Sequence, residues 1–176
     1  MNEFTRLYRL DALSDEPRAV GIEAGPAERE ALAARFRLVA LDSLAAEAQI
    51  SRQGDVALAA GLVRARVTQA CIATSEPVEQ EVEENFRIEF RPPPDSRGEE
   101  EIELGEEELD VVFYEGGAID LGEAAAQTLL LGLDPYPRSP AAEAALREAG
   151  VKSEEEARAE SSPFAALEAL KGKLES

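Results

Sequence analysis

Hydrophobic and polar residues alternate strictly along residues 78–91, which is the clearest pattern in the chain. The hydrophobic members are all even-numbered: Val78, Val82, Phe86, Ile88 and Phe90. Glutamate and arginine fill most of the odd positions between them. Because successive side chains of a strand point to opposite faces, this alternation predicts a strand with one buried face and one solvated face.

The stretch before it predicts a partner strand, joined through a tight corner at residues 74–77. Hydrophobic residues fall on even positions from Val56 to Leu62 and on odd positions from Val63 onward. A shift of one residue sends side chains to the opposite face unless a residue is inserted. The change of phase therefore predicts a β-bulge or sharp bend at residues 60–62.

Shorter patterns predict the remaining strands. The expected strands lie at residues 4–10, 19–23, 44–50 and 109–114, with a hairpin loop at 51–55. One helix is expected to open at Pro26, because proline suits the first helical position.

A second helix is predicted to begin at Asp120, whose side chain is a good N-cap. Glu123 stands three residues later, which suggests a capping box. Leucine or alanine recurs every fourth residue from Leu121 to Leu133, and Leu130 and Leu131 widen the apolar stripe. Such a helix is expected to cover the apolar face of the sheet.

These elements predict an α+β fold: a twisted antiparallel sheet of about five or six strands, covered on one face by helices. Residues 1–137 form the expected domain, and residues 138–176 form a helical or flexible C-terminal tail. The last part of the tail has the spacing of a small amphipathic helix, with apolar positions at Phe164, Leu167 and Leu170. This helix either folds back on the body or docks in a groove of a partner.

Charge is concentrated in one third of the chain. The whole chain has 37 acidic and 18 basic residues, a net charge of −19, and residues 78–115 alone contribute −12. Three prolines open a segment, residues 92–107, that is expected to be a mobile acidic loop. Its candidate partner-binding residues are Glu99, Glu100, Glu101, Glu103, Glu106 and Glu107.

Two interpretations of this acidity remain open. It either only keeps the protein soluble or recruits a basic protein partner. A strongly negative field repels phosphate backbones and disfavours nucleic-acid binding. The opposing observation is a set of arginines that could form a basic stripe across the hairpin: Arg64, Arg66, Arg87 and Arg91. Cross-strand ion pairing with neighbouring glutamates is the simpler account of them.

The sequence offers little for catalysis. It has no histidine and a single cysteine, Cys71, which lies in phase with Val63 and Val67 and is expected to be a small buried side chain. No nucleotide-binding loop or nucleophile motif appears. A calcium-like site near residues 99–108 is conceivable, but the spacing fits no EF-hand loop. We expect neither an enzyme nor a bound cofactor.

Targeting signals are also missing from the sequence. The first residues lack the basic and apolar regions of a signal peptide. No apolar run approaches the length of a transmembrane helix. We expect a cytoplasmic protein with no membrane contact.

Three blocks together resemble the YceD family, the large ribosomal RNA subunit accumulation proteins. They are residues 67–77 at the corner, residues 119–137 around the second helix, and the terminal Ser162-Pro163-Phe164-Ala165-Ala166-Leu167. Thr74 stands where the family has the second cysteine of a C-x-x-C corner, so a thiol pair or zinc role is lost. Thr128 replaces an acidic residue and Asp134 replaces a proline.

The resemblance implies a non-enzymatic factor for accumulation of 23S ribosomal RNA and assembly of the large subunit. Its expected partner is a basic ribosomal protein or an assembly factor. Direct binding of ribosomal RNA through the arginines is the alternative. The residues expected to be structural are Cys71, Asp120 and Glu123. The oligomeric state stays open.

Overall fold

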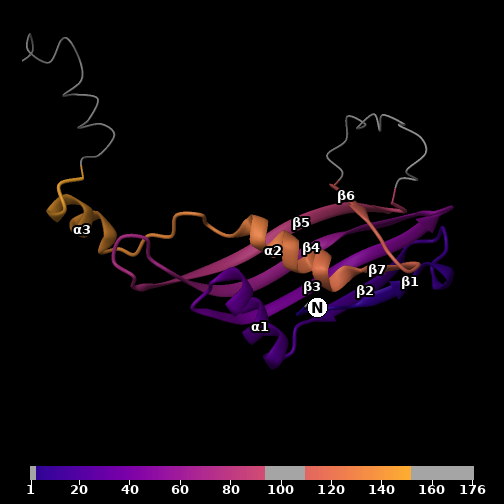
Figure 1. Ribbon diagram of the computed structural model, residues 1–176, viewed down its shortest axis with the longest axis horizontal. Helices are drawn as coiled ribbons and strands as arrows, with labels where there is room; N and C mark the ends of the chain where they lie inside the picture. Colours follow the sequence, from indigo (N-terminus) through magenta and orange to yellow (C-terminus); the bar gives the residue numbers. More distant parts are fainter. Residues whose placement is uncertain (1–2, 94–109, 152–176) are drawn as a thin grey trace, which may run out of the picture.

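The computed structural model describes residues 3–93 and 110–151 (Figure 1). The strands are β1 (Leu7–Arg9), β2 (Arg18–Glu23), β3 (Ala40–Gln53), β4 (Val56–Ala70), β5 (Pro77–Arg91), β6 (Asp110–Phe113) and β7 (Ala118–Asp120). The helices are the 3-10 turn η1 (Leu10–Ala12) and the α-helices α1 (Pro26–Phe36), α2 (Leu121–Gly132) and α3 (Ala142–Glu148).

Five strands form the main sheet in the order β2-β3-β4-β5-β6, and β1 pairs with β7 in a separate small sheet. The α+β class is thus confirmed. The expectation of an entirely antiparallel sheet is wrong, because β6 pairs with β5 in parallel. A long connection, residues 92–109, separates these two strands, and a parallel pair needs such a long connection. The pairing of β7 with β1 was also not predicted.

The buried face of β5 agrees with its alternation, since Val82, Phe86, Ile88 and Phe90 are all buried. Its partner β4 differs from the prediction. The β4–β5 register runs unbroken from Ala57 to Ala70. No bulge lies at residues 60–62; the irregularity is in β3, between Leu41 and Ser43.

Size complementarity across the ladder explains why β4 keeps one phase. Small β4 residues lie directly opposite large β5 residues on the buried face: Ala57 opposite Phe90, Ala59 opposite Ile88, and Gly61 opposite Phe86. The large β5 side chains fill the space that the β4 side chains leave. Val56, Leu58 and Leu62 consequently lie half-exposed on the other face of β4.

Helix α2 lies against β4 and β5, and α1 lies against β3 (Figure 1). Asp120 accepts hydrogen bonds from the backbone N–H groups of Gly122 and Glu123, at 3.1 and 3.2 Å, and so caps α2. Leu129 is fully buried, but Leu130 and Leu131 are 47% and 82% exposed. The wide apolar stripe predicted for α2 is therefore wrong, because the sheet contacts only one side of the helix.

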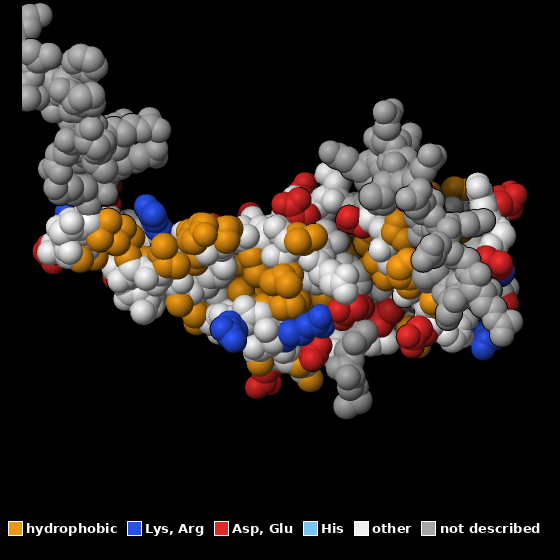
Figure 2. Space-filling model, turned by 45° about the horizontal axis from the view of Figure 1, so that its top comes forward, with side chains coloured by type: hydrophobic (Ala, Val, Ile, Leu, Met, Phe, Trp, Pro, Cys, Tyr) orange, Lys and Arg blue, Asp and Glu red, His pale blue; other side chains and the backbone are white. Residues whose placement is uncertain are grey.

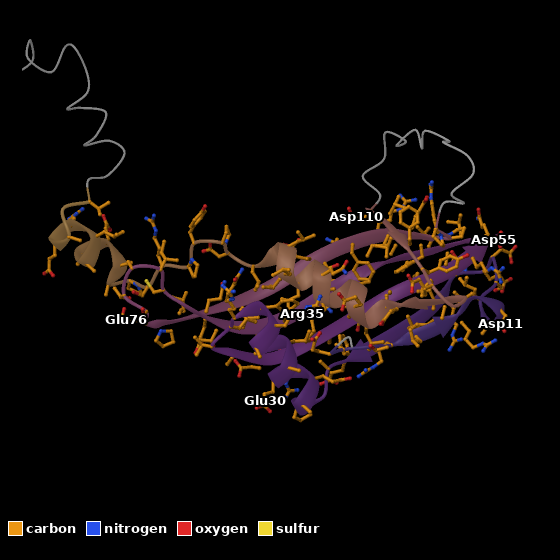
Figure 3. All side chains as sticks on the ribbon, in the orientation of Figure 1. Asp11, Glu30, Arg35, Asp55, Glu76 and Asp110 are labelled. Carbon is orange, nitrogen blue, oxygen red and sulfur yellow. The ribbon has the colours of Figure 1, made fainter. Side chains whose placement is uncertain are left out.

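Glu123 does not form the predicted capping box. Its carboxylate accepts hydrogen bonds from the guanidinium of Arg35 on α1, at 2.7 and 2.9 Å. The Arg35 guanidinium also donates to Glu3, at 3.0 Å. This charged contact joins the two helices and lowers the pKa of Glu123, chiefly through the hydrogen bond from Arg35. Figure 3 shows Arg35 between the helices.

A capping interaction of the same kind is found at α1 instead. The Glu28 carboxylate accepts from the backbone N–H of Gly25 at 2.7 Å. It also accepts two hydrogen bonds from the guanidinium of Arg6, at 2.6 and 2.8 Å. The hydrogen bonds from Arg6, followed by that from Gly25, lower the pKa of Glu28 from 4.5 to about 2.

This pKa predicts how Glu28 contributes to stability as the pH changes. The folded state favours the ionised carboxylate, so the contribution is complete above about pH 4.5 and is lost as the pH falls toward 2. We expect Glu28→Gln to lower the melting temperature at pH 7. The difference from the parent protein should close between pH 4.5 and 2 in thermal denaturation.

Glu30→Gln is the matched control, because Glu30 is exposed on the same helix (Figure 3). It removes one carboxylate without removing a contact to Arg6. A melting-temperature difference for Glu28→Gln that stays constant over this pH range would contradict the assignment.

Candidate functional site

The candidate site has two parts. One is the face of the main sheet opposite α2, which we call the open face, and the other is the outer margin of β5. The row of half-exposed β4 side chains described above, Val56, Leu58 and Leu62, belongs to the open face. Sequence reasoning missed this row because it assigned these residues to the core. The sequence signal that could have identified this row is the small size of the odd-numbered residues of β4, which lie opposite large residues of β5.

All of the residues predicted to bind a partner lie outside the described residues, so this prediction stays untested. They are Glu99, Glu100, Glu101, Glu103, Glu106, Glu107, Phe164, Leu167 and Leu170. The described acidic residues of the site include Glu47 of β3 and the open-face glutamates of β5. Glu81 and Glu83 have side-chain exposures of 81% and 65%.

The four arginines proposed for RNA binding occupy this face, and the contacts of Arg64, Arg66 and Arg91 with carboxylates are as follows. Arg64 lies 3.1 Å from Glu83 and 3.6 Å from Glu47. Arg66 lies 3.2 Å from Glu81. Arg91 donates to Glu89 at 2.8 Å. The Arg64 and Arg66 pairs are the cross-strand pairs that the sequence favours.

Ion pairs this exposed contribute little to stability, on the order of 0–1 kcal/mol each. A charged partner can therefore replace one member of a pair at small cost. The face presents both signs of charge close together, so a polyanion meets repulsion from the glutamates beside each arginine.

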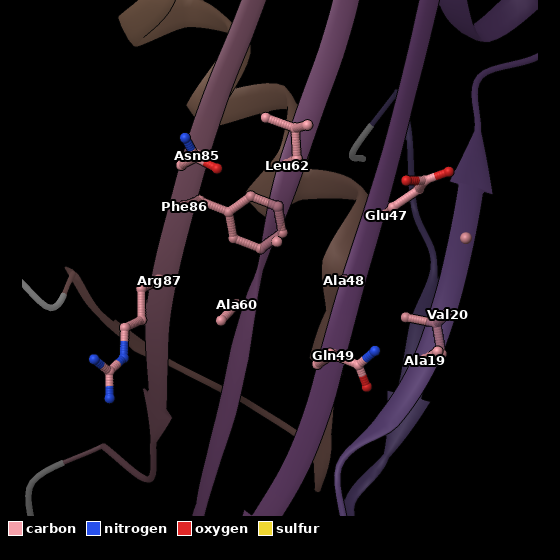
Figure 4. A pocket seen from close by; sticks show the side chains of 12 residues that line it. Ala19, Val20, Glu47, Ala48, Gln49, Ala60, Leu62, Asn85, Phe86 and Arg87 are labelled. Carbon is pink, nitrogen blue, oxygen red and sulfur yellow. The ribbon is translucent and has the colours of Figure 1, made fainter.

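A shallow hollow of about 830 Å³ crosses the middle of the open face (Figure 4). Strands β2 to β5 line it with small, apolar and polar residues, including Gly21, Gln49, Leu62 and Arg87. The hollow is shallow, which suits contact with an extended or flat partner surface.

The corner between β4 and β5 holds a separate polar cluster. Cys71 is buried, and its Sγ accepts from the backbone N–H groups of Ser139 and Ala73, at 3.3 and 3.4 Å. The Ser139 hydroxyl donates to Glu76 at 2.6 Å, and the Thr74 and Ser139 hydroxyl oxygens lie 3.0 Å apart. Figure 3 labels Glu76 at this end of the sheet.

The surroundings of Cys71 change its acidity. Burial raises the pKa of the thiol, but the hydrogen bond from the Ser139 N–H, the nearby hydroxyls of Thr74 and Ser139, and the hydrogen bond from the Ala73 N–H outweigh this and lower the pKa to about 6. Thr74 thus belongs to the same polar cluster as Cys71, through its contacts with Glu76 and Ser139. The cluster fastens residue 139 to the corner of the sheet.

No group of three or more His, Cys, Asp or Glu side chains within residues 3–93 and 110–151 is placed to hold a metal ion. None of the helices in this part of the chain has the length and apolar character needed to cross a bilayer.

The fold and site define a small α+β protein with one face of its sheet packed against helices and the other face open and charged. The family model described as "Large ribosomal RNA subunit accumulation protein YceD" matches residues 59–171, and the chain belongs to the YceD family. No curated protein and no solved structure matches the chain. The matched segment begins within β4 and includes β5, β6, β7, α2 and α3.

Proposed function

We propose that this protein supports biogenesis of the large ribosomal subunit and accumulation of 23S ribosomal RNA in the cytoplasm. It acts without catalysing a reaction, through contacts between an acidic surface and a basic ribosomal protein or assembly factor. The single observation that carries the proposal is the match to the YceD family over residues 59–171.

The described surface supports a basic protein as the partner. Helices cover one face of the sheet, which leaves the open face and the β5 margin for contact. Glutamates of β5 project from this region, and the acidic residues expected at 92–107 follow directly in the chain. Complementary charge steers such partners and sets their specificity.

Direct binding of ribosomal RNA is the second candidate. The observation in its favour is that Arg64, Arg66, Arg87 and Arg91 share one face. Against it, Arg64, Arg66 and Arg91 each lie against a glutamate, and the net charge of the chain is −19. A protein partner therefore agrees better with the charge distribution.

Co-sedimentation with ribosomal particles from a cell lysate tests the proposal. We expect the full-length protein to sediment with large-subunit precursors at low salt and to dissociate as the salt concentration rises. Basic proteins captured with it should remain bound after ribonuclease treatment.

Three outcomes would contradict parts of this proposal. If the protein stays out of all ribosomal fractions, the family role fails for this chain. If ribonuclease removes every captured partner, RNA is the direct ligand. If binding does not respond to salt, the acidic surface does not provide the contact.

A further inference from the structure

Within the part of the chain that the structure describes, the outer edge of β5 has no partner strand along most of its length. Strand β6 pairs only with Ile88–Arg91 of β5. Among residues 3–93 and 110–151, no backbone hydrogen bond joins Pro77–Phe86 to any residue outside the ladder with β4. An unpaired edge presents a row of N–H and C=O groups that can accept another strand.

The side chains along this edge are acidic on both sides of the strand. Glu79, Glu81 and Glu83 are on the open face, and Glu84 is on the face toward α2. Glu79 and Glu84 form no ion pair with any residue that the structure describes. Figure 2 shows acidic side chains next to exposed hydrophobic ones on this side of the molecule.

The end of α2 adds an apolar element beside the same edge. A Cβ at Gly132 would lie 2.5 Å from the Cγ of Glu84 and 2.8 Å from Val82, so the last turn of α2 rests on this part of β5. The adjoining Leu131 is 82% exposed. The side chains of a strand added here would point alternately to two faces. Those on the open face would meet glutamates, and those on the face toward α2 would meet Leu131 and Glu84.

We propose that the Pro77–Phe86 edge of β5 binds an extended, lysine- or arginine-rich segment of a partner protein as an added strand, at the same edge where β6 pairs with Ile88–Arg91. This inference rests on the proposed basic protein partner and specifies how that partner is held. Main-chain hydrogen bonds hold the segment, and alternating side chains give specificity. The favoured segment alternates basic and small apolar residues, because successive side chains reach opposite faces.

The same charges argue against the other occupants of this edge. A second copy pairing through its own β5 would place glutamates against glutamates, and like charges on facing strands are destabilising. The outer edge of β2 (Arg18–Glu23) is shorter and bears one arginine and one glutamate, so it lacks the acidic character that selects a basic strand.

The first test uses the full-length protein and a fluorescent peptide in which lysine and valine alternate. Two further peptides have the same sequence, one N-methylated at every lysine and the other at every valine. In an added strand only alternate N–H groups face β5. We therefore expect one methylated peptide to bind like the parent and the other to bind at least about tenfold more weakly in fluorescence anisotropy.

The second test locates the site with the triple variant Glu79→Gln, Glu81→Gln, Glu83→Gln. Its control is Glu16→Gln, Glu23→Gln, Glu30→Gln, which changes the net charge equally at exposed positions on other elements. We expect about tenfold weaker peptide binding for the first variant and little change for the control.

Equal binding of both methylated peptides, or equal weakening in both triple variants, would overturn the added strand in favour of general charge attraction. The ribosomal role is tested separately by co-sedimentation. Sedimentation with ribosomal particles, combined with equal binding of both methylated peptides, would refute the added strand and support the family role. Strand-specific peptide binding without sedimentation would support the edge site and refute the ribosomal partner.

Discussion

Replacing Gly61 by alanine is expected to destabilise the protein by about 3 kcal/mol. A Cβ at this position would lie 2.1 Å from the backbone oxygen of Glu47 and 2.7 Å from the Cα of Ala48. Both obstacles are backbone atoms of β3, the neighbouring strand. They move only if β3 and β4 separate, which breaks ladder hydrogen bonds and opens the packing opposite Phe86.

Gly21→Ala is the matched control for this prediction. Gly21 lies in β2 of the same sheet, and a Cβ built there meets no atom within 4 Å. The added methyl group removes backbone freedom from the unfolded chain, so this variant should be unchanged or slightly more stable. Urea denaturation of both variants provides the measurement. Equal midpoints for Gly61→Ala and the parent protein would show that the two strands are not in such close contact.

Leu129→Ala is expected to cost about 3 kcal/mol, whereas Leu131→Ala should cost about 0.5 kcal/mol or less. The two leucines are two residues apart in α2, and the sequence pattern predicts an apolar stripe that includes both. Leu129 is fully buried in the core, and Leu131 is 82% exposed. Truncating Leu129 leaves a cavity above the sheet, but truncating Leu131 removes only solvated surface.

Thermal or urea unfolding of the two variants separates these outcomes. Comparable losses of stability in both variants would mean that Leu131 is covered in the free protein.

The Leu131 variant also tests the proposed strand-binding edge, because Leu131 borders that edge. A loss of peptide binding without a loss of stability would place Leu131 in the contact with the partner.

The weak ion pairs of the open face connect the fold to the proposed role. Arg64 and Arg66 hold Glu83 and Glu81 near the strand surface while leaving them exposed. A basic partner can take over these carboxylates without leaving a charge buried, so binding does not pay a large desolvation cost. Such binding leaves the hydrophobic core unchanged, because the core lies on the face of the sheet toward α2 and the ion pairs lie on the open face.

The resemblance to the YceD family, drawn from three short blocks, is confirmed by the match over residues 59–171. The blocks around the corner and around α2 lie in the described structure. There, Asp120 caps α2 and Cys71 is held by the N–H groups of Ser139 and Ala73. The terminal block lies outside the described residues, and its docking role stays a prediction.

The sequence by itself determined the features that depend on near neighbours in the chain. The period of two in β5 selected its buried face, Pro26 marked the start of α1, and Asp120 marked the start of α2. Each of these signals acts within a few residues, because strand alternation and helix capping are set by local backbone geometry.

Only the tertiary structure decided which side of β4 is buried, which direction β6 runs, and that Glu123 binds Arg35 rather than its own helix end. Each depends on a partner far away in the sequence. Even-numbered valine and leucine residues of β4 lie on the open face because Phe86, Ile88 and Phe90 already fill the space opposite its small odd-numbered residues. The hydrophobicity pattern of one strand carries no information about the side-chain volumes of the neighbouring strand. Close packing of the core depends on the side-chain volumes of both strands.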